Sequence, residues 1–207
     1  MKNIAVYKKF ILCFVFIVAG CVALKTERVN ITYYTLKYEA PAFKGETLPV
    51  NVWIGDVKID PVYDTDKFVY STDGYKIAED FYHRWRVNPA KLIRSMIEKD
   101  FIRSNFFYSV GIRPSSRDIY AVIAHIFKFY EQDCEDGTYA ILDMNVTLDK
   151  MNAWDNSVIN IFQKKYYKKT LAHKKNPEAI AKAMSEAVKE LSTHIIYDTY
   201  NAIKNSK

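Results

Sequence analysis

The chain has 207 residues, of which 49% are hydrophobic, 15% aromatic and 26% charged, and this composition excludes a disordered or low-complexity chain. The formal net charge is +6, but Lys2, Lys8 and Lys9 lie in a segment that we expect to be removed. Without them, 27 basic residues face 24 acidic ones. So small a surplus, with no arginine-rich stripe, argues against a nucleic-acid partner.

Residues 1–20 have the layout of a bacterial lipoprotein signal peptide. A positively charged start is followed by an apolar run over residues 10–19, which would form about 15 Å of helix, roughly half of a bilayer's hydrocarbon core. The run is therefore too short to span a membrane. Its end matches the lipobox, in which small residues admit the signal peptidase and a cysteine carries diacylglycerol: Val18, Ala19, Gly20 and Cys21. An ordinary signal peptide that happens to end at a cysteine is the alternative.

Lipidation at Cys21 would place up to three acyl chains on the mature chain. Each buried CH₂ contributes about 0.8 kcal/mol, so two or more chains give stable membrane attachment. Residues 21–30 are then the lipidated tether, and residues 31–207 form a periplasmic domain. In Gram-negative bacteria an Asp after the lipidated cysteine commonly retains a lipoprotein in the inner membrane. Val22 therefore favours the periplasmic face of the outer membrane. We expect no cofactor besides the covalent lipid, such as palmitate.

The first part of the predicted domain is rich in strands. Residues 48–57 alternate, with Val50, Val52 and Ile54 on one face. A loop follows through Asp60-Pro61 to Asp66, and Asp73-Gly74 is a hairpin-turn signal. The strands are predicted at residues 31–38, 48–57, 67–71 and 75–85.

Two Asn-Pro pairs mark the predicted helix starts. Asparagine is a good N-cap, and a proline at the first helical position loses no hydrogen bond. The first helix starts at Asn88-Pro89; the second starts at Asn176-Pro177 and runs close to Asn205. Apolar residues at helical spacing give each helix one buried face. Between the helices we expect further strands at residues 118–131, 138–150 and 157–168, the first two joined by a turn at residues 134–137.

These elements predict an α+β fold: a mostly antiparallel β-sheet with two α-helices packed on one face, in a single domain. In the strand at residues 138–150, Leu142, Met144 and Val146 share one face, while Asp143 and Asn145 point the other way. That second face is therefore expected to be exposed to solvent or to contact a partner. Long paired strands of this kind also make a homo-oligomer that associates edge to edge plausible.

The sequence offers no catalytic constellation. It lacks a Gly-x-Ser-x-Gly elbow, a Walker loop, a Gly-x-Gly-x-x-Gly turn and a His-Glu-x-x-His pair. Cys134 is the only cysteine expected in the mature domain, which excludes an internal disulfide. The four histidines are far apart in sequence, and the acidic residues at 131–136 do not have EF-hand spacing. We therefore predict no enzyme activity, no catalytic residue and no metal site.

Lysines and aromatic residues are the remaining unusual features. A basic cluster at residues 164–175 would either meet an anionic partner or protect an edge strand from aggregation. Aromatic residues crowd the first third of the chain, where they either pack in the core or line a protein-binding surface or apolar groove. The crowded residues are Tyr33, Tyr34, Tyr38, Tyr63, Tyr70, Tyr75, Phe81, Tyr82 and Trp85.

Several local patterns together resemble the ABC-type transport auxiliary lipoproteins, the PqiC-like family of outer-membrane lipoproteins. The resemblance covers essentially the whole mature domain and includes the lipobox before it. Its motifs are Tyr33-Tyr34-Thr35-Leu36, Tyr63-Asp64-Thr65-Asp66-Lys67-Phe68-Val69-Tyr70, Tyr82-His83-Arg84-Trp85 and Asn88-Pro89, with Leu92 and Phe106 following.

The resemblance implies a non-catalytic, lipid-anchored accessory subunit of an MCE/ABC-type lipid transport system that links the inner and outer membranes. Its partners would be an MCE-domain protein and the associated membrane components. Cys21 would be the anchor, and five residues would be family-pattern positions at the core or at a partner or groove surface: Tyr33, Tyr34, Tyr70, Tyr82 and Trp85. The alternative function is an outer-membrane lipoprotein that activates or scaffolds an envelope-assembly enzyme such as a peptidoglycan synthase.

Overall fold

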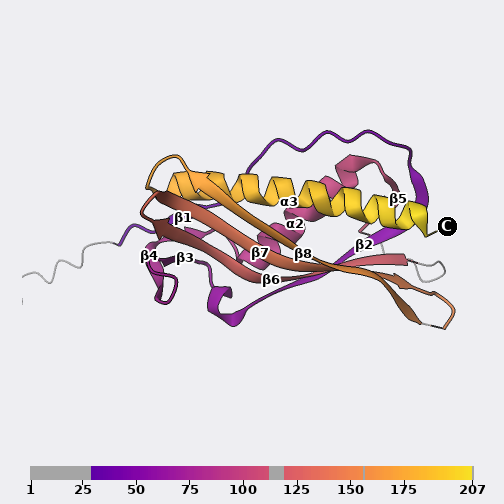
Figure 1. The fold of residues 1–207 in the computed structure, drawn as a ribbon, viewed down its shortest axis with the longest axis horizontal. Coiled ribbons are helices and arrows are strands. Elements are labelled where there is room, and N and C mark those ends of the chain that lie inside the picture. Colours follow the sequence, from indigo (N-terminus) through magenta and orange to yellow (C-terminus); the bar gives the residue numbers. More distant parts are fainter. Residues whose placement is uncertain (1–28, 112–118, 156, 207) are drawn as a thin grey trace, which may run out of the picture. The chain divides into compact units, whose positions relative to one another are not determined.

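The structure, a computed structural model, describes residues 29–111, 119–155 and 157–206 (Figure 1). The predicted signal peptide at residues 1–20, its recognition residues and the lipidation site Cys21 lie outside the described residues. Residues Ile31–Lys207 form one compact unit. All elements described below belong to this unit.

An eight-stranded mixed sheet forms most of the domain. Its strands are β1 (Thr32–Tyr34), β2 (Leu48–Ile59), β3 (Lys67–Ser71), β4 (Ile77–Trp85), β5 (Phe107–Val110), β6 (Ile119–Cys134), β7 (Gly137–Met151) and β8 (Val158–Ala172). A short 3-10 helix, η1 (Pro61–Tyr63), lies between β2 and β3.

Strand β6 is the centre of the sheet. One of its edges pairs with β7, which pairs in turn with β8, and both pairings are long and antiparallel. Its other edge is shared: β2 pairs with residues 119–126, and β3 pairs with Glu131 and Gln132. Both of these pairings are parallel, as are those of β1 with β4 and of β2 with β5. The α+β fold is confirmed, while the short parallel pairings were not part of the prediction.

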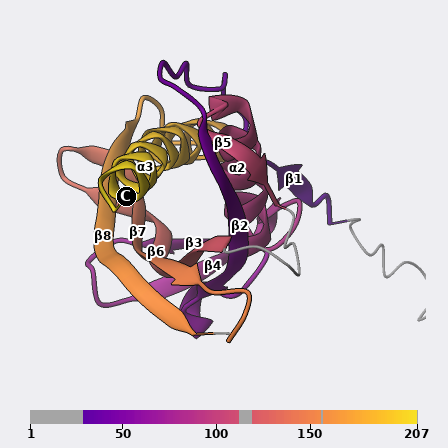
Figure 2. The same ribbon diagram turned by 90° about the vertical axis from the view of Figure 1, so that its right-hand side faces the viewer.

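The two α-helices, α2 (Pro89–Ser104) and α3 (Pro177–Asn205), lie on the concave side of the curled sheet (Figure 2). Both predicted caps are present, because the side chains of Asn88 and Asn176 accept hydrogen bonds from Ala90 N and Ala179 N. Asn105 ends α2 in the left-handed conformation, with φ of 55°. Asparagine tolerates this conformation better than most residues.

The core lies between the inner face of the sheet and the apolar stripes of the helices. Alternate residues of β7 are fully buried, and Met184, Val188 and Ile195 of α3 belong to the same hydrophobic cluster. Each such side chain contributes about 1.5–3 kcal/mol through burial. The buried β7 residues are Ala140, Leu142, Met144, Val146 and Leu148.

The outer face of β7 differs from the prediction, since part of it is covered. Ile141 is 1% exposed, and the carboxylate of Asp143 is buried beside Lys165, whose Nζ lies 3.0 Å from it. Tyr130, the β6 partner of Ile141, stacks against Tyr63 of η1 with ring centroids 5.7 Å apart. The segment between β2 and β3 therefore packs on this face and buries the nearby positions.

The predicted strand at residues 31–38 is shorter than expected. Only Thr32–Tyr34 pairs with the sheet, because the chain then crosses to the helices. Lys37 N donates to Ser185 Oγ on α3 at 3.0 Å, and Tyr38 Oη donates to Asp100 on α2 at 2.7 Å. These bonds to helix side chains replace the strand pairing that the sequence pattern predicted.

Candidate functional site

A cluster of exposed aromatic rings and two arginine side chains lies where β1 pairs with β4. Arg86 is exposed, whereas the Arg84 side chain is 20% exposed. We define this aromatic patch as Tyr33, Phe81, Tyr82, Arg84 and Arg86. The three rings are 50%, 53% and 54% exposed. Because large aromatic side chains are costly to leave in water, a group of them on one surface indicates a contact site.

Phe81 and Tyr82 of the aromatic patch lie in a bulge of β4. Lys67 of β3 pairs with Arg84, and the next β3 residue pairs with Asp80, so residues 81–83 have no partner on β3. The Asp80 carboxylate accepts hydrogen bonds from the backbone N–H of Tyr82 at 2.7 Å and of His83 at 3.1 Å. These bonds hold the bulge in place and thereby fix the position of Phe81 and Tyr82.

Asp80 is held in its charged form. Burial alone raises the pKa of this carboxyl, but hydrogen bonds from the His83 side chain and from two backbone N–H groups outweigh burial. The resulting pKa lies below the ordinary value. His83 Nδ1 is 2.7 Å from Asp80 Oδ2. The bulge is therefore anchored by an ionised carboxylate throughout the neutral pH range.

Cations connect the rings of the aromatic patch. The guanidinium of Arg84 lies 5.7 Å from the centre of the Phe81 ring, and that of Arg86 lies 5.9 Å from the Tyr33 ring. Phe81 and Tyr82 meet edge to face at 5.5 Å. Arginine over an aromatic ring is a favourable arrangement that keeps a positive charge beside an apolar surface. The patch is therefore both apolar and basic.

The five aromatic residues that were predicted at the core or at a surface differ in how deeply they are buried in the structure. Trp85 is 2% exposed and stacks on Phe68 at 4.4 Å, so the expectation that it lies at a partner surface is corrected. Tyr34 is half-buried and packs against the same Phe68 ring at 5.1 Å. Tyr33 and Tyr82 are exposed, and Tyr70 is 37% exposed on β3.

Three patch residues were missing from the predicted surface set. Phe81 stood among the crowded aromatic residues, but nothing marked it as exposed, and Arg84 and Arg86 were not considered as surface residues. The adjacent pair Phe81-Tyr82 breaks the strict alternation of a strand, and this was the available signal of a bulge.

A second exposed apolar site lies at the turn between β7 and β8. We define this hairpin tip as Trp154, Val158 and Ile159, which are 90%, 55% and 58% exposed. Backbone and side-chain hydrogen bonds close the turn, with Asn152 N donating to Ser157 O at 2.9 Å. This site was not predicted from the sequence, although a tryptophan among turn-forming polar residues is its signal.

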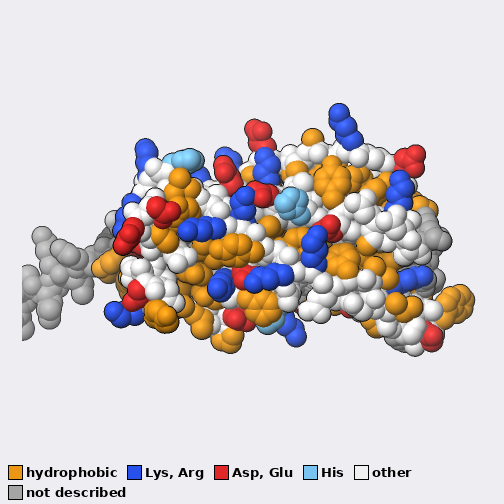
Figure 3. All heavy atoms as spheres, in the orientation of Figure 1, with side chains coloured by type: hydrophobic (Ala, Val, Ile, Leu, Met, Phe, Trp, Pro, Cys, Tyr) orange, Lys and Arg blue, Asp and Glu red, His pale blue; other side chains and the backbone are white. Residues whose placement is uncertain are grey.

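The two sites lie toward opposite ends of the domain. Strands β1, β3 and β4 lie toward the end where β6 turns into β7, whereas the hairpin tip lies at the other end of β7 (Figure 1). Strand β7 has 15 residues and so extends about 50 Å. Figure 3 shows hydrophobic side chains along the whole of this face, the two ends included, with charged side chains of both signs among them.

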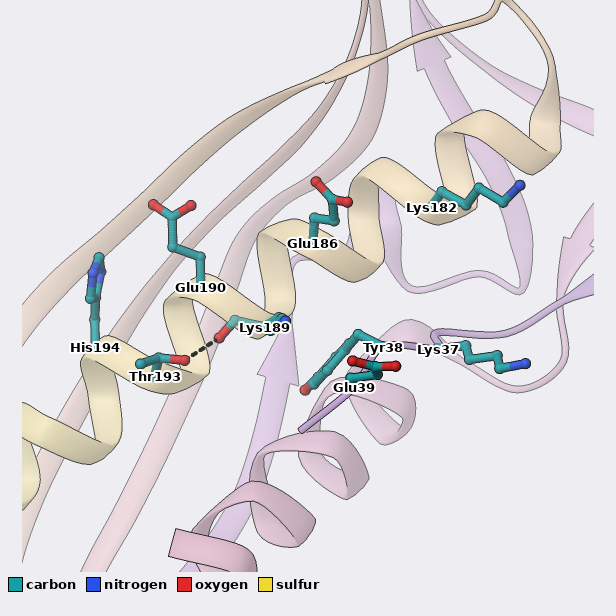
Figure 4. A pocket seen from close by; sticks show the side chains of 9 residues that line it. All are labelled: Lys37, Tyr38, Glu39, Lys182, Glu186, Lys189, Glu190, Thr193 and His194. Carbon is teal, nitrogen blue, oxygen red and sulfur yellow. Dashed lines mark hydrogen bonds between the residues drawn. The ribbon is translucent and has the colours of Figure 1, made fainter. Parts of the chain in front are cut away.

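An open groove of about 580 Å³ lies between α3 and the segment at residues 37–39 (Figure 4). Its lining contains acidic and basic side chains in similar number, and Figure 4 shows them spread along the helix without a common focus. Glu190 pairs with Lys168 of β8. The lining residues are Lys37, Tyr38, Glu39, Lys182, Glu186, Lys189, Glu190, Thr193 and His194.

A His-Asp pair lines another cavity, of about 560 Å³, at the start of α2. His125 Nε2 is 2.9 Å from Asp60 Oδ1, and the ring stacks on Phe127 at 4.5 Å. None of the residues that line this cavity is a serine, threonine or cysteine, so the pair has no hydroxyl or thiol nucleophile among them. In the described ranges, no three His, Cys, Asp or Glu side chains are grouped to hold a metal ion.

The predicted basic cluster is largely paired within the domain. Lys164 Nζ is 2.7 Å from Asp198 of α3, and Lys175 Nζ is 2.8 Å from Asp133. Lys169 lies 3.8 Å from the Tyr139 ring. These internal contacts favour a structural role for the cluster over an anion-binding role.

A comparison with models of protein families shows the family of this chain. The model of the ABC-type transport auxiliary lipoprotein component matches residues 34–196, which include most of the sheet, all of α2 and most of α3. The chain belongs to this family. The family is one of lipoproteins that accompany ABC-type transporters, which indicates a membrane-anchored location in the cell envelope and a transporter as partner. No curated protein matches the chain in sequence.

Solved structures share the fold of this auxiliary lipoprotein at low sequence identity. A Xanthomonas campestris protein of the family DUF330 matches with a TM-score of 0.72 and 12% identity, over 84% of this chain and 98% of its own. An uncharacterised protein matches with a TM-score of 0.62 and 13% identity, over 82% and 98% of the two chains. A hypothetical protein from Chlamydia trachomatis matches with a TM-score of 0.52 and 9% identity, over 75% and 98%.

Proposed function

We propose that the protein is a non-catalytic accessory subunit of an MCE/ABC-type lipid transport system. In this proposal Cys21 anchors it to the periplasmic face of the outer membrane, and the domain docks on an MCE-domain protein. The observation that carries the proposal is the family match over residues 34–196, since that family accompanies ABC-type transporters.

The hairpin tip is the docking surface that this function requires. Trp154 has the side chain that most often dominates the binding energy of protein interfaces, and it is 90% exposed. Val158 and Ile159 extend the apolar surface beside it. The tip also lies at the end of the domain away from β1, the strand that the tether enters. A partner reaching the domain from the periplasm would therefore meet the tip first.

Purification of the tagged protein from its own envelope in a mild detergent tests this function. We expect mass spectrometry to find an MCE protein among the co-purifying proteins. Trp154→Ser should reduce its recovery about tenfold or more, since an interface tryptophan commonly contributes 2 kcal/mol or more. Tyr75→Ser is the matched control, because Tyr75 is 95% exposed in the β3–β4 turn toward the other end of the domain.

The outcomes separate the two candidate functions. An MCE protein that is lost with Trp154→Ser and kept with Tyr75→Ser supports both the transport role and the docking surface. Equal loss in both variants would contradict the docking role of the hairpin tip. Recovery of peptidoglycan synthases after crosslinking, with no MCE component, would contradict the transport role and favour an envelope-assembly function.

A further inference from the structure

The aromatic patch has the composition of a surface that rests on a lipid bilayer. Phenylalanine has an apolar ring, and tyrosine has an apolar ring with a polar end. Tyrosine is enriched where membrane proteins cross the headgroup region. Arginine beside such rings adds attraction to anionic headgroups. The patch contains three exposed rings, and the guanidinium groups of Arg84 and Arg86 lie over two of them, Phe81 and Tyr33.

The position of the patch in the chain determines its occupant. Tyr33 lies on β1, the first of the described strands, only 12 positions after Cys21. A fully extended chain of that length spans at most about 40 Å. An acyl anchor on Cys21 therefore keeps this ring close to the membrane that holds the anchor. Tethering raises the effective concentration of the patch at the bilayer, so weak partitioning is enough to seat it.

The rigidity of the patch supports the same role. The β4 bulge is fixed by the Asp80 carboxylate, and Tyr33 is held by the pairing of β1 with β4. Phe81 and Tyr82 therefore have little backbone freedom to lose on contact with lipid. The carboxylates around the patch already have cationic or His partners: Glu79 pairs with Lys67, and Asp66 lies 3.5 Å from Arg84. Repulsion from anionic headgroups is reduced accordingly.

We propose that the aromatic patch of Tyr33, Phe81, Tyr82, Arg84 and Arg86 is a membrane-contact surface that seats the domain on the lipid bilayer carrying its anchor. Contact at this end orients β7 away from the bilayer and leaves the hairpin tip free. The inference rests on the lipid anchor of the proposed function and is independent of which transporter the protein serves.

Lipid-borne quenching in a reconstituted system tests the inference. The mature acylated protein, with Cys134→Ser, is incorporated into vesicles of phosphatidylethanolamine and phosphatidylglycerol. An environment-sensitive fluorophore is attached to a cysteine at one of two positions, Tyr82→Cys in the patch or Trp154→Cys in the hairpin tip. Both side chains are exposed, so neither change disturbs the core. Phospholipids with a quencher near the headgroup then report contact.

We expect quenching of the label at position 82 to exceed that at position 154 several-fold. Adding Tyr33→Ser and Phe81→Ser should lower quenching at position 82 to the level of the tip, whereas Tyr75→Ser should leave it unchanged. Far-ultraviolet circular dichroism confirms that each variant is folded. Because the vesicles contain no transporter, the result does not depend on the docking partner.

Three outcomes would overturn the inference. Equal and weak quenching at both positions in vesicle-bound protein would show that the patch faces water, while leaving the anchor intact. Disulfide-linked dimers through Tyr82→Cys at low protein density would assign the patch to a second copy of the chain. Failure of the protein to associate with vesicles at all would refute the anchor and the inference together.

Discussion

The surroundings of Glu131 change the pKa of its side chain. It lies on β6 opposite Tyr70 of β3, and the pKa of its carboxyl is raised to about 7, with burial as the largest cause. The negative charges of Asp133 and Asp80 contribute to this rise, and the positive charge of Lys175 and the nearby His83 oppose it. A carboxyl with this pKa is half-protonated at neutral pH.

The raised pKa predicts a pH-dependent stability. The folded state binds a proton at Glu131 more tightly than the unfolded state, whose carboxyl has the ordinary pKa near 4.5. Stability is therefore lost as the pH rises from about 4.5 through about 7. Glu131→Gln should remove this loss and raise the free energy of unfolding at pH 8 by roughly 1–3 kcal/mol, with little change at pH 4.

Urea unfolding at the two pH values measures the effect of Glu131→Gln. Glu135→Gln is the control, since Glu135 is exposed in the adjacent β6–β7 turn. This variant should have the same free energy of unfolding as the wild type at both pH values. An unchanged pH dependence in Glu131→Gln would show that its carboxyl is ionised normally in the folded protein.

At the residue scale, the sequence pattern marked a group of aromatic residues, but it did not predict which of them are buried and which are exposed. Tyr33 and Tyr82 are exposed, whereas Trp85 is buried. Which side of β4 each residue faces depends on the bulge at residues 81–83, because one register shift moves every following side chain to the other face. That bulge depends on pairing with β1 and β3, and local alternation does not contain this information.

Among the elements, those with local signals were predicted best. Both Asn-Pro starts give helices at the expected residues, and the 67–71 strand has the predicted bounds. The four-residue strand β5 was not expected, since it is too short for a recognisable period. The parallel pairing of β2 and β3 with one edge of β6 was also unpredicted, because it joins segments more than 60 residues apart.

The cap of α3 provides a direct test of its local signal. The Asn176 side chain accepts a hydrogen bond from Ala179 N at 2.8 Å and so satisfies one of the free N–H groups of the first turn. Asn176→Ala should lower the free energy of unfolding by about 1 kcal/mol, as N-cap substitutions commonly do. Asn176→Asp keeps the acceptor and should have little effect. Equal denaturation midpoints for all three proteins would show that packing alone fixes the start of α3.

At the scale of the whole molecule, the edge of β8 that faces away from β7 is relevant to oligomerisation. Among the described strands β8 pairs only with β7, so its other edge lacks a strand partner in that part of the chain. Lys164 and Lys168 lie on this strand and pair with α3 carboxylates. Lysines on an edge strand oppose unregulated strand addition. Edge-to-edge association remains a prediction, and these lysines are the side chains that a second copy would displace.

In the proposed function the location of the whole molecule depends on Cys21, and this dependence provides the last test. Two or more acyl chains hold a protein on a membrane, whereas a surface patch of a few rings gives only weak, reversible binding. Neither helix in the described ranges is long and apolar enough to cross a membrane. Because the acyl chains are the anchor in the proposed function, Cys21→Ala should either release the domain into the soluble periplasm or leave an unprocessed precursor.

Fractionation and mass determination of Cys21→Ala distinguish these results from the wild type. Cys134→Ala is the matched control, because Cys134 is a free thiol at the end of β6, and it should remain in the membrane fraction. If Cys21→Ala is processed and sediments with membranes as the wild type does, the lipid anchor is refuted. If the released domain still binds lipid vesicles weakly, and Tyr33→Ser with Phe81→Ser removes that binding, the aromatic patch accounts for the residual contact.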